Sequence, residues 1–382
     1  MTPGIQVFVY PEELLFVGAE ELADQIVGLG CDAVSISLVY HRARRVFPRH
    51  RRISVLTGNG IYFTPDRDRY GEIAPSACAP AELQAKVARF RVVCAQQGLR
   101  FRAWLVGLHD ESLAREHSHA GARALDGSSL GHGLCPSVPA AVEYIAAVAA
   151  DVAGQFEPEG IDLEAWLYPA WEPAYTMTQA LEPLSPDAEL FATQCFCASC
   201  RSLMGAAAAE LEQRAKRAAG HPFGERASDD DPTLFEELAA FRRTGATQLA
   251  SAVANALDGS GTWLRLLCSG PAEQLTLQGL SPSTIRPADA VQLGCARLRG
   301  SELLARFQSL RALVEDSPHS VTVSTNWTPE RTPPTMADDV TALASLGADG
   351  LSLYNLSLVP DAGLVAFQAA SAAFREASAS RS

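Results

Sequence analysis

The segment EGIDLEAWLYPAWEP, residues 159–173, places two carboxylates inside a short apolar run. Asp162 and Glu164 stand at alternate positions, and Trp166 continues that alternation before a Tyr-Pro pair ends the run. Side chains at positions i, i+2 and i+4 of a β-strand lie on one face of the sheet. The segment therefore predicts a strand that directs two acids and one indole toward the same place.

Similar apolar runs recur along the chain, and a longer amphipathic stretch separates each run from the next. The expected strands are the quoted segment and residues 5–10, 33–40, 100–110, 262–270, 288–296, 321–329 and 350–360. Strands that alternate with helices form parallel sheets, and eight such units form a (β/α)8 barrel. An open, doubly wound sheet is the alternative, but no expected strand leads into the Gly-x-Gly-x-x-Gly turn typical of that fold.

The predicted fold class is therefore α/β, a (β/α)8 TIM barrel with long loops after strands 2, 3 and 4. The chain has 382 residues, of which 47% are hydrophobic, and this is enough for one large core. We expect a single catalytic domain over residues 1–375 and a flexible tail over residues 376–382.

The charge and hydropathy of the chain argue against several classes of partner. A net charge of −13 disfavours nucleic-acid binding, which relies on clustered Lys and Arg. No apolar stretch reaches the roughly 18 residues of a membrane span, and the N-terminal sequence lacks the basic and apolar regions of a signal peptide. We expect a cytoplasmic protein with no nucleic-acid or membrane partner, and the oligomeric state stays open.

One segment departs from this acidic balance. HRARRVFPRHRR, residues 41–52, carries six arginines. The segment is either a solvated loop or a guanidinium-lined rim that receives an anionic group of a substrate.

The nine cysteines form an odd set, and most lie inside apolar runs, which favours reduced thiols. The segment CFCASC, residues 195–200, has the Cys-x-Cys-x-x-Cys spacing of a zinc site, for which Cys135 or a histidine would supply the fourth ligand. Three reduced thiols at the start of a helix are the alternative, and the spacing alone does not decide. No catalytic metal and no dissociable cofactor is expected.

Polar and aromatic side chains gather where the expected strands end. In a (β/α)8 barrel the reacting groups lie at the carboxyl ends of the strands. The residues at these ends, or in the loops that follow, are the candidates for substrate binding: Tyr10, Tyr40, His41, Tyr62, Trp104, His109, Trp166, Asn326, Trp327, Tyr354 and Asn355.

The two acids of the quoted segment predict acid/base chemistry. Carboxylates at i and i+2 of a strand are close enough to repel, and the repulsion raises the pKa of one of them. One protonated and one ionised carboxyl is the pair that acid/base hydrolysis needs. The alternative is that Asp162 pairs with a buried arginine such as Arg102 or Arg265.

The quoted segment also resembles a known signature. EGIDLEAWLYP is similar to the fourth strand of glycoside-hydrolase-like barrels, roughly Asp-Gly-Ile-His-Leu-Asp-Tyr-x-Arg-Tyr-Pro. Glu164 falls on the acidic position, Asp162 falls on the His position, and Leu167 replaces the Arg; the matching residues are Gly160, Ile161, Leu163, Tyr168 and Pro169. A more distant likeness to the chitinase motif Asp-Gly-x-Asp-x-Asp-x-Glu places Trp166 where that family has its catalytic Glu.

The resemblance implies hydrolysis of a glycosidic bond in a glycoside or small oligosaccharide by carboxylate acid/base catalysis. Glu164 is then the leading acid/base, Asp162 tunes or assists it, and Asp110 ranks next as the partner, ahead of Glu273 and Glu330. The expected sixth strand ends without an acid. Two alternatives therefore stay open, a sugar-binding barrel without catalysis and a hydrolase of an anionic natural-product conjugate.

Overall fold

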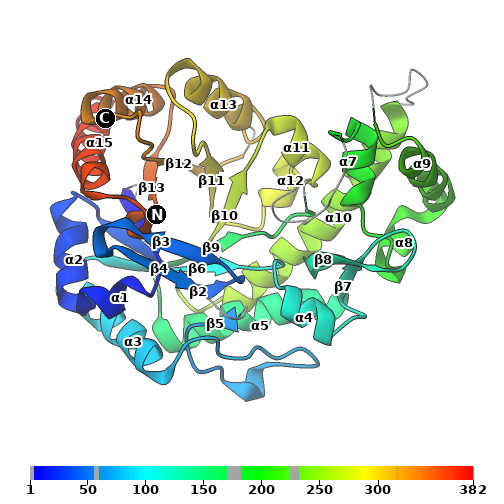
Figure 1. Cartoon of the computed structure of the whole chain (residues 1–382), viewed down its shortest axis with the longest axis horizontal. Helices are drawn as coiled ribbons and strands as arrows, with labels where there is room; N and C mark the ends of the chain where they lie inside the picture. The colour runs from blue at the N-terminus through cyan, green and yellow to red at the C-terminus, as the bar shows by residue number, and fades with distance from the viewer. Residues whose placement is uncertain (1–3, 56–59, 170–181, 224–231, 316, 382) are drawn as a thin grey trace.

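The computed structural model describes residues 4–55, 60–169, 182–223, 232–315 and 317–381. Eight parallel strands form a closed barrel, because each pairs with the next and β1 pairs with both β13 and β2 (Figure 1). The strands are β1 (Ile5–Val9), β2 (Ala33–Tyr40), β6 (Arg100–Val106), β9 (Gly160–Glu164), β10 (Trp263–Ser269), β11 (Ala290–Gly294), β12 (Ser320–Asn326) and β13 (Gly350–Tyr354). The predicted (β/α)8 barrel is confirmed.

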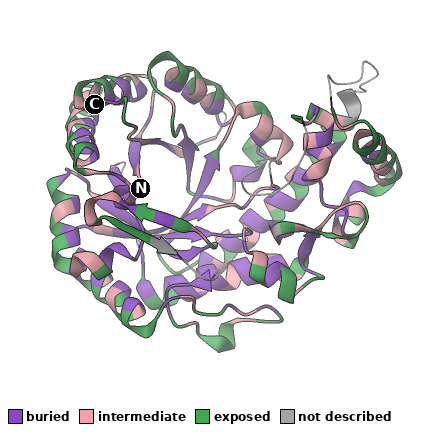
Figure 2. Cartoon of the chain, in the orientation of Figure 1, coloured by how far each residue is buried: buried purple, intermediate pink, exposed green. Residues whose placement is uncertain are grey.

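Helices surround the barrel and bury one face against it. The strands are almost wholly buried, whereas the helices alternate buried and exposed residues (Figure 2). In α2, for example, Leu22 and Ile26 are one turn apart and both are fully buried. The helices are α1 (Glu13–Phe16), α2 (Gly18–Gly28), α3 (Ala81–Gln96), α5 (Pro139–Phe156), α10 (Pro232–Leu257), α11 (Ala272–Leu277), α12 (Pro282–Ile285), α13 (Gly300–Ala312), α14 (Pro333–Ser345) and α15 (Asp361–Ala379).

The long connections that the sequence predicts after strands 2, 3 and 4 are present, and each contains further structure. A hairpin of β3 (Arg44–Phe47) and β4 (Arg52–Val55), with β5 (Gly60–Ile61), follows β2. The third connection holds α4 (Glu111–Glu116), β7 (Gly121–Arg123) and β8 (Ser129–Leu134). The fourth holds α7 (Pro186–Ala192), α8 (Ala198–Met204) and α9 (Ala208–Gly220), which lie on the side of the barrel away from the termini (Figure 1). Short 3-10 turns are η1 (Pro48–His50), η2 (Arg67–Arg69), η3 (Gly205–Ala207) and η4 (Leu356–Leu358).

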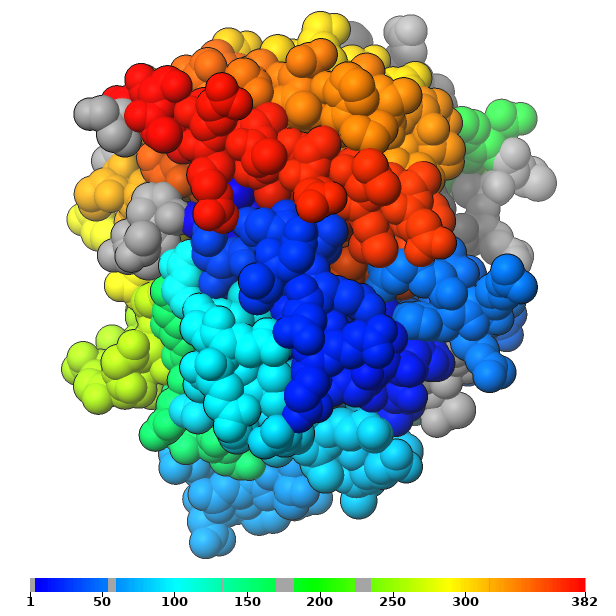
Figure 3. Space-filling model, turned by 90° about the vertical axis from the view of Figure 1, so that its left-hand side faces the viewer, coloured from blue at the N-terminus to red at the C-terminus, as the bar shows by residue number. Residues whose placement is uncertain are grey.

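The first and last elements of the chain meet on one face of the molecule. The N-terminal and C-terminal segments lie side by side in Figure 3, and Arg375 of α15 donates to the Gly30 carbonyl (2.8 Å) and to Asp32 (2.9 Å). Helix α15 continues through residues 376–379, part of the segment expected to be a tail.

A polar network fills part of the barrel interior. Asp162 of β9 and Arg265 of β10 are register partners, and the guanidinium forms two 2.8 Å hydrogen bonds with the carboxylate. Ser35 donates a third hydrogen bond to Asp162 (2.5 Å), and Arg265 also donates to Thr322 (3.2 Å). This ion pair is one of the two arginine pairings that the sequence left open for Asp162, whose side chain has no exposed surface.

The arginine-rich segment folds as a hairpin, and four of its six arginines are exposed to solvent, as the first alternative expects: Arg42, Arg44, Arg51 and Arg52. In the β3–β4 hairpin that it forms, two arginines pair with acids at the start of α1, directly after β1. Arg45 is buried and pairs with Glu12 (2.9 Å), and Arg49 pairs with Glu13. These ion pairs explain why the hairpin needs arginine at those two positions.

Two expectations from composition can be compared with the structure. None of the nine cysteines forms a disulfide, which agrees with the prediction of reduced thiols. Among the helices of the described residues, none combines the length and the apolar character required to cross a bilayer.

Candidate active site

Glu164 ends β9 at the mouth of the barrel, and its neighbours fix its direction. Its Oε2 accepts a 2.7 Å hydrogen bond from the Trp104 indole N–H on the adjacent strand β6. Ala165 then turns the chain with a φ of 53°, and its carbonyl accepts from Leu108 N–H at 2.9 Å. The strand therefore stops at Glu164, and the half-buried carboxyl faces the mouth of the barrel.

Burial raises the pKa of the Glu164 carboxyl, because the charged form loses its hydration. The hydrogen bond from Trp104 opposes that rise in pKa, since it stabilises the carboxylate. The repulsion that the sequence predicts from Asp162 is not the cause, because Arg265 pairs with the Asp162 charge deeper in the barrel. The expectation of a raised pKa agrees with the structure, and the expected reason is corrected.

Three phenols lie beside this carboxyl. The Tyr10 hydroxyl lies 3.0 Å from that of Tyr40 and 3.1 Å from that of Tyr354. Burial raises the pKa of all three phenols, and the nearby charge of Glu164 adds to the rise. The tyrosines therefore stay protonated near neutral pH, and their rings pack against Trp104 with centroid distances of 5.0 to 5.9 Å.

A cavity of about 300 Å³ opens next to Glu164. Its size falls at the small end of the range of ligand pockets. The residues of the wall that offer polar or aromatic groups are Glu164, His41, His109, Trp166, Tyr168, Ser269, Gln274 and Gln278. Of the candidates for substrate binding, His41, His109 and Trp166 thus line the cavity.

Two histidines form a flat part of the wall. The rings of His41 and His109 stack with centroids 4.2 Å apart and an angle of 14° between their planes. The Tyr40 ring also stacks on His41, with ring centroids 4.3 Å apart. Burial lowers the pKa of His41, so this ring is neutral near pH 7.

The other candidates for substrate binding do not line the cavity. Tyr10, Tyr40, Trp104 and Tyr354 form the group beside Glu164, and the remaining four lie elsewhere. Tyr62 donates to Glu12 (2.9 Å) below the β3–β4 hairpin, and Asn355 accepts from Ser357 N–H at the start of η4. Asn326 accepts from the backbone of Arg297 and donates to the Trp327 carbonyl (3.2 Å). Trp327 packs partly buried against the core.

The candidate partner carboxylates are also outside the cavity. Asp110 is buried and caps α4, where it accepts from Leu113 N–H at 2.9 Å. Glu273 and Glu330 are exposed on the surface. Among the described residues that line the cavity, Glu164 is the single carboxylate.

Several cavity residues were not singled out from the sequence as substrate contacts. Ser269 ends β10, Gln274 lies on α11, and Gln278, four residues later, is the C-cap of that helix. A polar pair at i and i+4 after a strand is a usable signal, although it is common on solvated helices. Gln278 also donates to the Tyr168 carbonyl (2.8 Å), which holds α11 against the residues after β9.

Among the described residues, the group with the composition of a metal site is Cys135, Cys195, Cys197 and Cys200, whose sulfurs lie within 4.8 Å of one another. None of these cysteines lines the cavity. A metal ion bound there would therefore not contact a ligand in the cavity.

Comparisons with known proteins place the fold. No family model and no curated protein matches the chain. Among solved structures, the catalytic domain of β-amylase from Paenibacillus polymyxa is 10% identical over 99% of both chains, with a TM-score of 0.63. The PgaB glycoside hydrolase domain from Bordetella bronchiseptica is 14% identical over 96% of this chain and 98% of its own, with a TM-score of 0.58. A β-galactosidase from Marinomonas ef1 is 11% identical over 98% of this chain and 59% of its own, with a TM-score of 0.55. The chain therefore shares the barrel fold of known glycoside hydrolases.

Proposed function

We propose that this protein hydrolyses the glycosidic bond of a glycoside or small oligosaccharide, with Glu164 as the general acid. One observation carries the proposal: a half-buried carboxyl with a raised pKa stands at the end of β9, on the edge of a cavity. General acids need a carboxyl that stays protonated near the working pH, and burial supplies this property. The fold shared with glycoside hydrolases supports the same assignment.

The surroundings of Glu164 suit proton donation to a leaving-group oxygen. The Trp104 N–H occupies Oε2, so Oε1 is the oxygen that would carry the transferable proton. The three tyrosines pack around Trp104 and keep bulk water from the carboxyl on that side. Trp104 is therefore a positioning residue in this proposal.

The cavity wall offers what a sugar ring needs. The apolar faces of a pyranose pack on flat aromatic rings, which Trp166 and the His41–His109 stack supply. Ser269 and Gln274 bring a hydroxyl and an amide that can hydrogen-bond sugar hydroxyls.

The test of this function is a screen of chromogenic glycosides against the full chain, with binding of the corresponding sugars measured by calorimetry. Turnover of at least one glycoside at a rate proportional to enzyme concentration supports the proposal. The absence of a second carboxylate from the described lining of the cavity favours one alternative, a sugar-binding barrel without catalysis. Sugar binding without turnover in the same screen would select that alternative.

The Trp104 hydrogen bond gives a prediction for pH dependence. Replacing Trp104 with Phe removes the donor that lowers the pKa of Glu164, so this pKa rises further. A general acid works while protonated, and activity falls as the pH exceeds its pKa. The basic limb of the kcat/KM profile should therefore move to higher pH in Trp104→Phe. A basic limb at an unchanged or lower pH would contradict the assigned role of Trp104.

Asp110 gives a prediction that separates capping from catalysis. Asparagine caps helices about as well as aspartate, so Asp110→Asn should preserve both stability and kcat if the carboxylate only caps α4. A catalytic partner would instead lose about 10²-fold or more in kcat. Steady-state kinetics and a thermal melt of the same preparation distinguish the two roles.

A further inference from the structure

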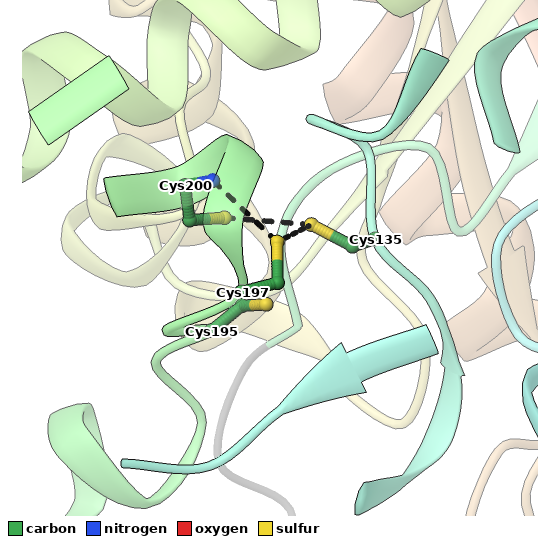
Figure 4. Close-up of side chains that lie close together, drawn as sticks. All are labelled: Cys135, Cys195, Cys197 and Cys200. Atoms are coloured by element: carbon green, nitrogen blue, oxygen red, sulfur yellow. Dashed lines mark hydrogen bonds between the residues drawn. The ribbon is translucent and has the colours of Figure 1, made fainter. Parts of the chain in front are cut away.

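We propose that Cys135, Cys195, Cys197 and Cys200 bind one zinc ion. Figure 4 shows the four side chains close together where two segments of the chain meet, with Cys135, Cys197 and Cys200 directed toward one another and Cys195 beside Cys197. The sulfur of Cys135 lies 3.4 Å from that of Cys200 and 3.8 Å from that of Cys197. A tetrahedral zinc ion with bonds of about 2.3 Å requires sulfurs about 3.8 Å apart, so the cluster needs little adjustment to receive it.

The cluster joins two long loops that the barrel itself does not connect. Cys135 directly follows β8 in the connection after β6, and the other three come from the start of α8 in the connection after β9. All four are buried. A metal ion at this point would bind the β7–β8 hairpin to α8, beside the 2.8 Å backbone hydrogen bond from Phe196 N–H to the Arg123 carbonyl that already links the two connections.

Backbone amides already point at two of the sulfurs. The N–H of Cys200 donates to Cys197 Sγ at 3.4 Å, and the N–H of Arg123 donates to Cys195 Sγ at 3.3 Å. Such donors stabilise a thiolate, which is the form that binds zinc. The second contact comes from β7, so both loops contribute to the surroundings of the ion.

A buried arginine supplies the charge that such a site needs. Four thiolates around Zn²⁺ leave a net charge of −2. Arg242 of α10 is 1% exposed, and Cys195 and Cys200 lie close enough to interact with its charge. Its guanidinium donates to Gln194 Oε1 (2.6 and 3.1 Å) and to the Leu277 carbonyl (2.8 Å), and among the described residues it has no carboxylate partner.

A buried charge is normally paired. A zinc tetrathiolate beside Arg242 would provide the missing counter-charge, whereas four neutral thiols would not. A pair of disulfides would not provide it either, because a disulfide is neutral. The charge of Arg242 therefore favours the metal over both other states of the four cysteines.

The site also connects to the cavity through a short chain of contacts. Cys200 Sγ lies 3.5 Å from Ser137 Oγ, which is hydrogen-bonded to the Tyr168 hydroxyl, and Tyr168 is part of the cavity wall. Because four protein ligands fill the coordination of zinc, the ion has no open position for a substrate. Its role is structural, and it fixes the loop that carries Tyr168.

The experiment measures metal content of the full chain, purified without a histidine tag or chelator, by elemental mass spectrometry. About one zinc per chain is expected in the wild type, and almost none in Cys135→Ser and Cys197→Ser. The matched control is Cys78→Ser, a partly buried cysteine outside the cluster whose sulfur donates to the Ile61 carbonyl, a contact that serine preserves. This control should retain its zinc, and because the readout is metal content, the result is independent of the proposed glycosidase activity.

A second measurement covers variants that fail to fold. Titrating the wild type with a mercurial in the presence of a zinc-sensitive dye should release one zinc, and cobalt replacing it should give the visible absorption of a tetrahedral cobalt thiolate. A wild-type chain that contains no zinc and takes up no cobalt would overturn the proposal. Equal loss of zinc in Cys78→Ser, or a disulfide among the four cysteines in the purified protein, would overturn it too.

Discussion

Replacing Glu164 with glutamine is expected to lower kcat by about 10²- to 10⁴-fold, the usual contribution of a general acid. Glutamine has nearly the same size and keeps an oxygen that accepts a hydrogen bond from the Trp104 N–H. Its amide protons are not acidic, so it cannot transfer a proton to the leaving group. Substrate binding should therefore stay close to that of the wild type. The measurement is steady-state kinetics on a glycoside that the wild type cleaves, combined with calorimetry of the bound sugar.

The matched control for this variant is Glu273→Gln. Glu273 is exposed on α11, beside residues that line the cavity but not among them. Its kcat and KM should match those of the wild type. Equal rates for Glu164→Gln and the wild type would remove Glu164 from the mechanism.

Replacing Asp162 with asparagine is expected to lower the free energy of unfolding by about 3 to 5 kcal/mol, the typical cost of leaving one partner of a buried ion pair without its counter-charge. Arg265 would keep its charge inside the barrel with no carboxylate to balance it. Urea denaturation followed by tryptophan fluorescence measures the change, because unfolding exposes buried indoles such as Trp104.

A double variant makes this prediction specific. Replacing Asp162 with leucine and Arg265 with methionine together removes both charges, and such replacements often cost little. The double variant should therefore be more stable than Asp162→Asn. If Asp162→Asn instead kept full stability and lost activity, Asp162 would act in catalysis, as the sequence alone predicts, and its structural role would be wrong.

The barrel was predictable because its strands are buried on both faces. Such strands appear in a sequence as short apolar runs, and the helices between them repeat apolar residues at the spacing of one turn. The connection after β9 was harder, because α8 packs against α10 and α9, and α7 packs against α9, rather than on the barrel strands. Their arrangement depends on contacts between distant residues, which periodicity does not record.

The candidate site was predicted only in part, because the sequence shows which residues end a strand but not which loops and helices close over them. Glu164 was identified because it ends a strand, and strand ends meet at one rim. Asp162 is only two residues earlier, but that distance along a strand places its side chain one layer deeper, beside Arg265. Gln274 enters the cavity through the position of α11, and no local pattern in the sequence reports that position.

The pairing of β1 with β13, which closes the barrel, has a consequence for folding during synthesis. Residues 5–7 pair with residues 351–353, so the first strand keeps an open edge until residues 351–353 have left the ribosome. An unpaired strand edge invites association with other chains. Nascent chains that stall before residue 350 should therefore depend on chaperones and aggregate without them, whereas chains that include β13 close that edge within one molecule.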